Sequence, residues 1–216
     1  YDNHWDGIGY NNHQVSYVEI PAQDFLYEKR YVIFNAYRKP LSIQVYSRNM
    51  EFTYRSNHSR CMTREYNMGN LIITKYYLGD YEKEVMKNGK TREIHYLCGD
   101  NGLAAIYVKT DAKDTLFAAV TDRQNSLTAI MNTSTKKVER YSYKPWGMRR
   151  NSDDWTTKVS EDVPSRFSRG FCMHEHLPSY GLVNMGGRMY DVHLNQFVSP
   201  DPYKQKPESW LNQNRY

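Results

Sequence analysis

The chain has 216 residues, a formal net charge of +5, and 20 tyrosines beside 7 phenylalanines and 4 tryptophans. Such a length suits one domain or one segment of a larger protein. The positive charge is scattered, with short clusters such as Arg149-Arg150, and it forms no basic stripe of the kind that binds nucleic acid. No apolar run approaches the roughly 20 residues of a membrane helix. The sequence therefore predicts neither a nucleic-acid partner nor a membrane span.

Short runs of β-type residues, separated by turn residues, fill most of the chain. We expect strands over residues 15–20, 30–34, 41–46, 51–54, 61–66, 71–78, 81–86, 91–97, 103–108, 115–121, 127–131 and 137–143. Asn88-Gly89 marks a tight hairpin turn, because both residues accept positive φ angles. No convincing amphipathic helix interrupts the pattern, so an extended antiparallel meander is predicted.

The last quarter of the chain follows a polar stretch over residues 151–165, which we expect to be an exposed loop. After it, three short extended segments are predicted near residues 182–183, 188–190 and 196–198. Gly186-Gly187 separates the first two, and Pro200 ends the third. The fold class predicted for the whole chain is therefore all-β, with essentially no helix.

Two stretches resemble bacterial RHS/YD-repeat proteins. Residues 138–147 read VERYSYKPWG, similar to the YD-repeat unit E-R-Y-x-Y-D-P-W-G, with Lys144 in place of Asp. Residues 169–202 resemble the C-terminal RHS repeat-associated core. The positions that match the core signature are Gly170-Phe171, His174-Glu175, Gly181-Leu182, Arg188, Tyr190-Asp191, Phe197, Ser199 and Asp201-Pro202. The departures are Cys172-Met173 for Thr-Gly, Val192 for Pro and Asn195-Gln196 for Gly-Arg.

The resemblance implies an antiparallel sheet that coils into part of a hollow shell. Residues 1–150 would form YD-repeat shell, 151–165 the exposed loop, and 166–216 the start of the core, truncated at its C-terminal end. Such a shell encloses a C-terminal toxin or effector domain. The implied partners are that domain and neighbouring shell repeats, with a secretion-system component or an immunity protein as further candidates. The implied location is secreted or at the cell surface.

Three residues match the part of the family core that cleaves the chain downstream: Asp191, Asp201 and Arg188. Two nearby acids can share a proton and activate a peptide bond, and an arginine can orient a carboxylate. The structural alternative is that both aspartates stabilise turns and that Arg188 forms a cross-strand ion pair. We favour the structural alternative for this chain and leave open a self-cleaving, aspartate-dependent core.

Other motifs point to binding. His174 and His176 project to one side of a strand, as two metal ligands would, but no third ligand is identifiable, so no metal site is predicted. No cofactor motif is present. Trp146 and Trp155 are candidates for stacking on sugars, which would make the protein a surface adhesin or glycan-binding module. Their structural alternative is packing within the shell.

Overall fold

A computed structural model of the chain describes residues 8–11, 14–21, 27–100, 102–159 and 165–201. Nearly all of its elements are antiparallel strands. In the described ranges the helical elements are two single 3-10 turns, Phe171–Met173 and Pro178–Tyr180. The predicted all-β fold class is confirmed. Within the same ranges, no helix has the length and apolar character needed to cross a membrane.

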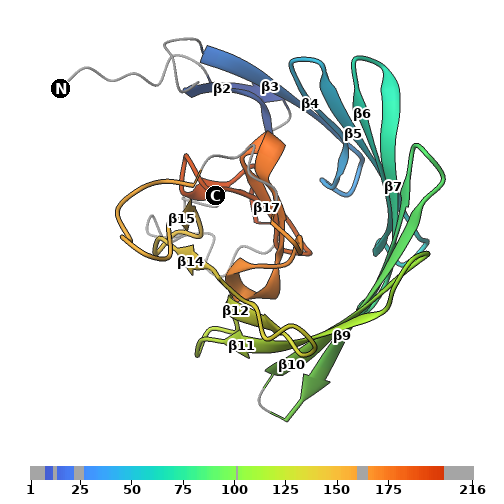
Figure 1. Cartoon of the computed structure of the whole chain (residues 1–216). Coiled ribbons are helices and arrows are strands. Elements are labelled where there is room, and N and C mark those ends of the chain that lie inside the picture. Colours follow the sequence, from blue (N-terminus) through green and yellow to red (C-terminus); the bar gives the residue numbers. More distant parts are fainter. Residues whose placement is uncertain (1–7, 12–13, 22–26, 101, 160–164, 202–216) are drawn as a thin grey trace.

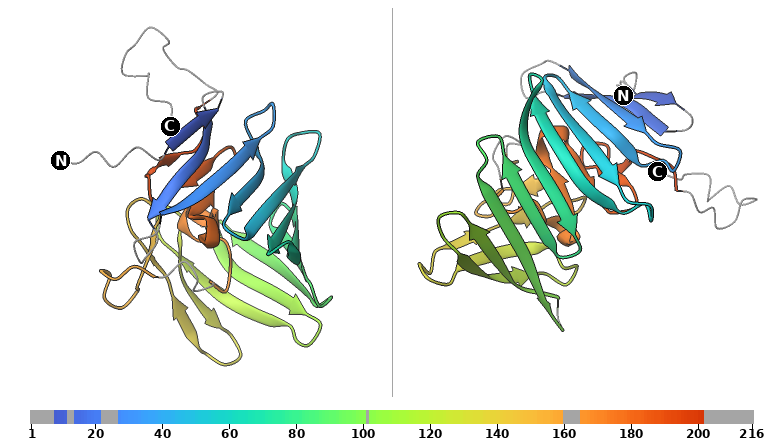
Figure 2. Two further views of the ribbon diagram at one scale, coloured as in Figure 1. Left: turned by 90° about the horizontal axis from the view of Figure 1, so that it is seen from above. Right: turned by 90° about the vertical axis from the view of Figure 1, so that its right-hand side faces the viewer.

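Thirteen strands form one large sheet, which we call the wall. Each strand pairs antiparallel with the next, so the order in space is the order in sequence. The strands are β1 (Ile8–Asn11), β2 (Gln14–Pro21), β3 (Tyr27–Phe34), β4 (Pro40–Val45), β5 (Arg48–Tyr54), β6 (Arg60–Asn67), β7 (Asn70–Leu78), β8 (Tyr81–Met86), β9 (Thr91–Gly99), β10 (Gly102–Thr110), β11 (Thr115–Thr121), β12 (Leu127–Asn132) and β13 (Val138–Arg140). The wall curls into a deep arc (Figures 1 and 2).

Residues 165–201, which we call the inner segment, lie within the arc of the wall (Figure 1). They contain a small sheet of four antiparallel strands: β16 (Glu175–Leu177), β17 (Leu182–Asn184), β18 (Met189–Asp191) and β19 (Gln196–Phe197). A hairpin of β14 (Ser142–Tyr143) and β15 (Arg149–Arg150) lies between the wall and this segment in sequence.

Alternation along the strands gives the wall an apolar inner face. In β4, Ile43 and Val45 are buried while Gln44 is exposed, as expected when one face of a sheet is covered. Two apolar clusters join the wall to the inner segment. The first contains Val32, Ile43, Val45, Met50 and Phe52 of the wall with Leu177, Tyr180, Leu182, Met189 and Val198. The second contains Ile94, Tyr96, Leu103, Ile106, Val108, Phe117, Leu127 and Ile130 with Phe167.

The expected strand over residues 137–143 is two strands with different partners. Val138–Arg140 pairs with β12, whereas Ser142–Tyr143 turns away and pairs with β15. The turn of this hairpin requires glycine: Gly147 has φ +84°, and a Cβ there would lie 2.9 Å from the Phe171 ring. In the expected loop, residues 153–157 are exposed, and residues 160–164 lie outside the described ranges. The division into three segments stays a prediction.

Candidate functional site: the junction of wall and inner segment

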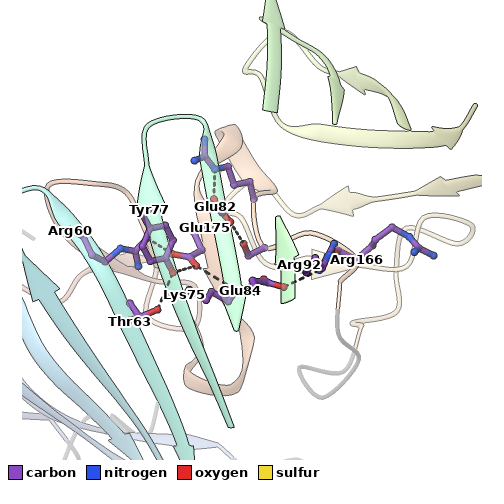
Figure 3. A network of polar contacts seen from close by, with 11 residues as sticks. Arg60, Thr63, Lys75, Tyr77, Glu82, Glu84, Arg92, Arg166 and Glu175 are labelled. Atoms are coloured by element: carbon purple, nitrogen blue, oxygen red, sulfur yellow. Dashed lines mark hydrogen bonds and ion pairs between the residues drawn. The ribbon is translucent and has the colours of Figure 1, made fainter. Parts of the chain in front are cut away.

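Charged side chains on the inner face of the wall meet charged side chains of the inner segment. Three arginine–carboxylate pairs with a buried carboxylate cross the junction: Arg60 with Glu175, Arg169 with Glu82, and Arg30 with Asp191. The wall supplies the arginine of two pairs and the carboxylate of the third. Figure 3 shows the part of this network around Glu175, Glu82 and Arg92. Charges buried in this way must be paired, because desolvating a lone charge costs several kcal/mol.

Glu175, in β16, makes the largest number of these contacts. Its carboxylate pairs with Arg60, accepts a hydrogen bond from the Tyr77 hydroxyl at 2.8 Å, and lies 3.8 Å from Lys75 Nζ. The Arg60 guanidinium also stacks on the Tyr77 ring, 4.0 Å from its centroid. Burial alone would raise the pKa of Glu175, but Arg60 and Lys75, with the Tyr77 hydrogen bond, bring that pKa below its ordinary value. Glu175 is therefore charged in the folded protein.

In the second pair the inner segment supplies the arginine and the wall supplies the carboxylate. Arg169 of the inner segment donates from Nε to Glu82 Oε1 at 2.8 Å and from Nη2 to the Gly79 carbonyl at 2.8 Å. Its guanidinium also stacks on the ring of Tyr96, 4.2 Å from the centroid. Burial, reinforced by the charge of Glu175, raises the pKa of Glu82 even though Arg169 opposes the shift. The environment of Glu82 thus favours the charged carboxylate less than the environment of Glu175 does.

The third pair lies at the other end of the junction. Both side chains, Arg30 of β3 and Asp191 of β18, are completely buried. Arg30 also donates to the Tyr180 carbonyl at 2.8 Å. The second carboxylate oxygen of Asp191 accepts the backbone N–H groups of His193 and Leu194, at 2.8 and 3.0 Å. Asp191 therefore fixes a turn of the inner segment and anchors that turn to the wall.

A cavity of about 300 Å³ remains between the wall and the inner segment. It is bordered by β5 to β9 on one side and by parts of residues 165–180 on the other. Arg92 crosses its edge: it donates to the Arg166 carbonyl at 2.6 Å and pairs with Glu84 at 3.3 Å. Arg166 in turn holds Glu139 through Nε and Nη2. The polar network thus continues from the inner segment to β13.

His176 faces this cavity from β16. Its Nε2 accepts the backbone N–H of Phe171 at 2.9 Å, so the imidazole acts as an acceptor. Burial, together with the nearby charge of Arg149, lowers the pKa of His176 to about 4. His174 precedes the strand instead of sharing it. Within the described ranges, no three His, Cys, Asp or Glu side chains gather as metal ligands.

The predicted catalytic residues fall into two separate contacts. Arg188 donates from Nη2 to Asp201 at 2.9 Å, and its guanidinium stacks on Phe197 with a centroid distance of 3.7 Å. The Asp201 side chain is 42% exposed. Asp191, in contrast, has both carboxylate oxygens engaged by Arg30 and by the turn. A catalytic role for these residues stays a prediction.

The two tryptophans lie on the surface. Trp146 is 60% exposed and Trp155 is 63% exposed, so packing within the shell does not explain either side chain. Trp146 belongs to the β14–β15 turn, and Trp155 to the loop that follows β15. Their role in binding also stays a prediction.

Sequence reasoning missed most of the junction. The sequence did not single out Arg30, Arg60, Glu82 or Arg169, and Glu175 was named only as a match to the core signature. A signal was present in one case: Arg30 alternates with the apolar residues Val32 and Phe34, so it belongs to the buried face of its strand. A charge on an apolar face indicates a buried partner.

Comparisons with known proteins show what the fold is similar to. No protein-family model matches the sequence, and no curated protein matches it. Among solved structures, the chain is similar to TcdB2-TccC3 (TM-score 0.64, 14% identity) and to TcdB2-TccC3-Cdc42 (TM-score 0.63, 13% identity), in each case over 80% of its length. It is also similar, over 93% of its length, to a Photorhabdus luminescens Tc holotoxin pore with a mutated TccC3 (TM-score 0.51, 13% identity). The chain spans 9% of each matched chain. The likeness concerns the fold, a coiled β-sheet shell.

Proposed function

We propose that this chain is a shell segment of an RHS/YD-repeat protein and that it helps to enclose a C-terminal toxin or effector domain. The observation that carries the proposal is the junction: three arginine–carboxylate pairs and two apolar clusters hold the inner segment against the concave face of the wall. In the whole protein, further turns of such a curved sheet would separate an interior from solvent, with the inner segment held against the concave face. The fold shared with the TcdB2-TccC3 chains supports the proposal.

The partners follow from this role. Neighbouring shell repeats would extend the wall by strand pairing, and the enclosed domain would contact the inner face. A secretion-system component and an immunity protein are further candidate partners, and the whole protein would be secreted or displayed at the cell surface. The sequence register of residues 138–147 and 169–202 supports the family assignment.

Limited proteolysis of the natural full-length protein that contains this segment tests enclosure. We expect a protease to leave a large interior fragment intact in the wild-type protein. The same fragment should be cut when the Glu175→Gln substitution weakens the junction. Uniform cleavage of the wild-type protein, with no protected fragment beyond the wall itself, would rule out an enclosing role.

Self-cleavage is a separate proposal for the same core. The partly exposed Asp201, oriented by Arg188, supports it, whereas the fully engaged Asp191 speaks for a structural role. The intact mass of the natural full-length product, measured beside the Asp201→Asn variant, separates the two. A released C-terminal fragment that disappears in the variant would establish cleavage, and one uncut mass in both proteins would exclude it.

A further inference from the structure

Trp155 has an unusual backbone conformation for its size. Its φ angle is +60°, in the left-handed region that bulky side chains rarely adopt. The side chain is nevertheless 63% exposed, so packing does not compensate for the conformation. Residues held in sparsely populated backbone regions concentrate at functional sites. The enclosing role of the wall explains neither this backbone conformation nor the exposure of the ring.

The indole ring is fixed in place although it is exposed. Its Nε1–H donates to the Ser152 carbonyl at 2.9 Å, and the Trp155 backbone N–H donates to the Asn151 carbonyl at 3.1 Å. The guanidinium of Arg150 lies over the ring, 5.4 Å from its centroid. The polar atom of the ring is thus already satisfied, and the ring presents apolar area to solvent in one orientation.

The loop around the ring is polar and hydrogen-bonded within itself. The Asp154 carboxylate accepts the backbone N–H groups of Thr156 and Thr157, each at 2.9 Å, and the Thr157 hydroxyl at 2.6 Å. Asp153 is exposed beside them. Between residues 151 and 158, Trp155 is the sole apolar side chain. One fixed aromatic ring is therefore surrounded by hydrogen-bonding groups.

This arrangement distinguishes between two classes of partner. A tryptophan at the centre of a protein interface lies within a wider well-packed patch, whose core is depleted of charged residues. A pyranose ring instead offers a small apolar face of C–H bonds with hydroxyl groups at its edge. Such a face matches one aromatic ring with polar neighbours, because the negative face of the ring attracts the polarised C–H bonds and the polar groups fix the orientation of the ligand.

We propose that Trp155 is the stacking platform of a carbohydrate-binding site on the exposed loop that follows β15. The exposed carboxylate of Asp153 and the guanidinium of Arg150 are the groups that would bond the hydroxyls at the edge of the sugar. The site uses none of the residues that join the wall to the inner segment, so it does not depend on the enclosing function.

The test is binding of this chain to an array of defined oligosaccharides, followed by titration of the best-bound oligosaccharide by isothermal titration calorimetry, a readout that does not depend on the indole of Trp155. We expect saturable binding that weakens about tenfold or more in Trp155→Ala and is largely retained in Trp155→Phe, which keeps an aromatic face. Tyr46→Ala is the matched control, because Tyr46 is also an exposed aromatic residue (64%) at a turn with positive φ (+52°). This control should bind like the wild type.

Two results would overturn the proposal. The first is an array on which the wild-type chain binds no oligosaccharide, or binds one that Trp155→Ala retains at full affinity. The second is a marked loss of stability in Trp155→Ala, measured by urea unfolding, which would identify the side chain as packing. A binding platform predicts that Trp155→Ala unfolds at the same urea concentration as the wild type or at a higher one.

Discussion

Replacing Glu175 by glutamine tests whether the ion-pair network holds the inner segment in place. Glutamine keeps the size of the side chain and one acceptor oxygen but removes the negative charge. The Arg60 side chain, 13% exposed, then loses its paired carboxylate, and Lys75, 17% exposed, loses one of two nearby carboxylates. Removing one partner of a buried pair typically costs about 3–5 kcal/mol. This is a large part of the 5–15 kcal/mol by which domains are usually stable.

Urea unfolding of the wild-type chain and of Glu175→Gln, followed by circular dichroism, measures the difference. Glu51→Gln is the control: Glu51 is exposed on the outer face and accepts a hydrogen bond from the Tyr66 hydroxyl at 3.1 Å. We expect this control to change the free energy of unfolding by less than about 0.5 kcal/mol. A cost below about 1 kcal/mol for Glu175→Gln would refute the reasoning, because it would mean that the positive charges at the junction are hydrated or paired in another way.

A double substitution separates the pair from its neighbours. In Arg60→Met combined with Glu175→Leu, both charges of the pair are absent, and Lys75 keeps Glu84 at 3.2 Å. Apolar replacement of a buried pair is often close to neutral. The double variant should therefore lose clearly less stability than the two single variants together, with a coupling of about 0.5–3 kcal/mol. Simple additivity would show that Arg60 and Glu175 act independently.

Three further predictions concern single side chains. Burial lowers the pKa of His176 from 6.5 to about 4. Between these two pH values, His176 is protonated in the unfolded chain and neutral in the folded chain. The free energy of unfolding should fall by about 2–3 kcal/mol from pH 7 to 4.5. His176→Gln should remove this part of the slope in urea unfolding, and an unchanged slope would contradict the assignment. Met68 is 78% exposed with φ +48°. Met68→Asn should therefore raise the free energy of unfolding by about 0.5–1 kcal/mol, measured by urea unfolding. A lower free energy of unfolding would contradict this. Asp191→Asn leaves the buried Arg30 without a counter-charge and should cost about 3 kcal/mol or more, whereas Asp201→Asn should cost about 1 kcal/mol or less. Equal costs in the two unfolding curves would argue against the separate environments of these aspartates.

The strands were predictable from sequence because their signals are local. Turn residues and alternation predict β7 over 71–78 and β8 over 81–86, and the structure has Asn70–Leu78 and Tyr81–Met86. The β14–β15 hairpin was missed because its strands have two residues each, which is too short for an alternating pattern.

The departures from the core signature of the RHS family became interpretable in the structure. Met173 and Asn195 occupy positions where the signature has glycine, and both adopt left-handed backbone conformations, with φ of +57° and +56°. Both residues thus adopt the backbone region that glycine enters most readily. Asparagine accepts this conformation readily, whereas methionine does so at a cost of about 1–2 kcal/mol. The sequence shows that glycine is replaced at these two positions, and the structure shows that the replacing residues adopt positive φ angles.

The junction was not predictable in the same way, because its partners are far apart along the chain. Arg169 lies 87 residues from Glu82, and Glu175 lies 115 residues from Arg60. Periodicity places a charge on a face of a strand but does not say which distant residue meets it. Asp191 and Arg188 were singled out through the family motif, yet the buried partner of Asp191, Arg30, lies 161 residues earlier.

These separations also set an order in time. The wall strands precede the inner segment in sequence, so they leave the ribosome before the residues that cover them. The inner segment then pairs backward along the wall: Arg169 with β8, Glu175 with β6, and Asp191 with β3. Arg30 can therefore pair only after the 161 residues that separate it from Asp191 have been synthesised. Until then the inner face of β3 and β4 stays uncovered. Exposed apolar surface promotes aggregation, so the nascent chain depends on rapid synthesis of the inner segment or on a chaperone.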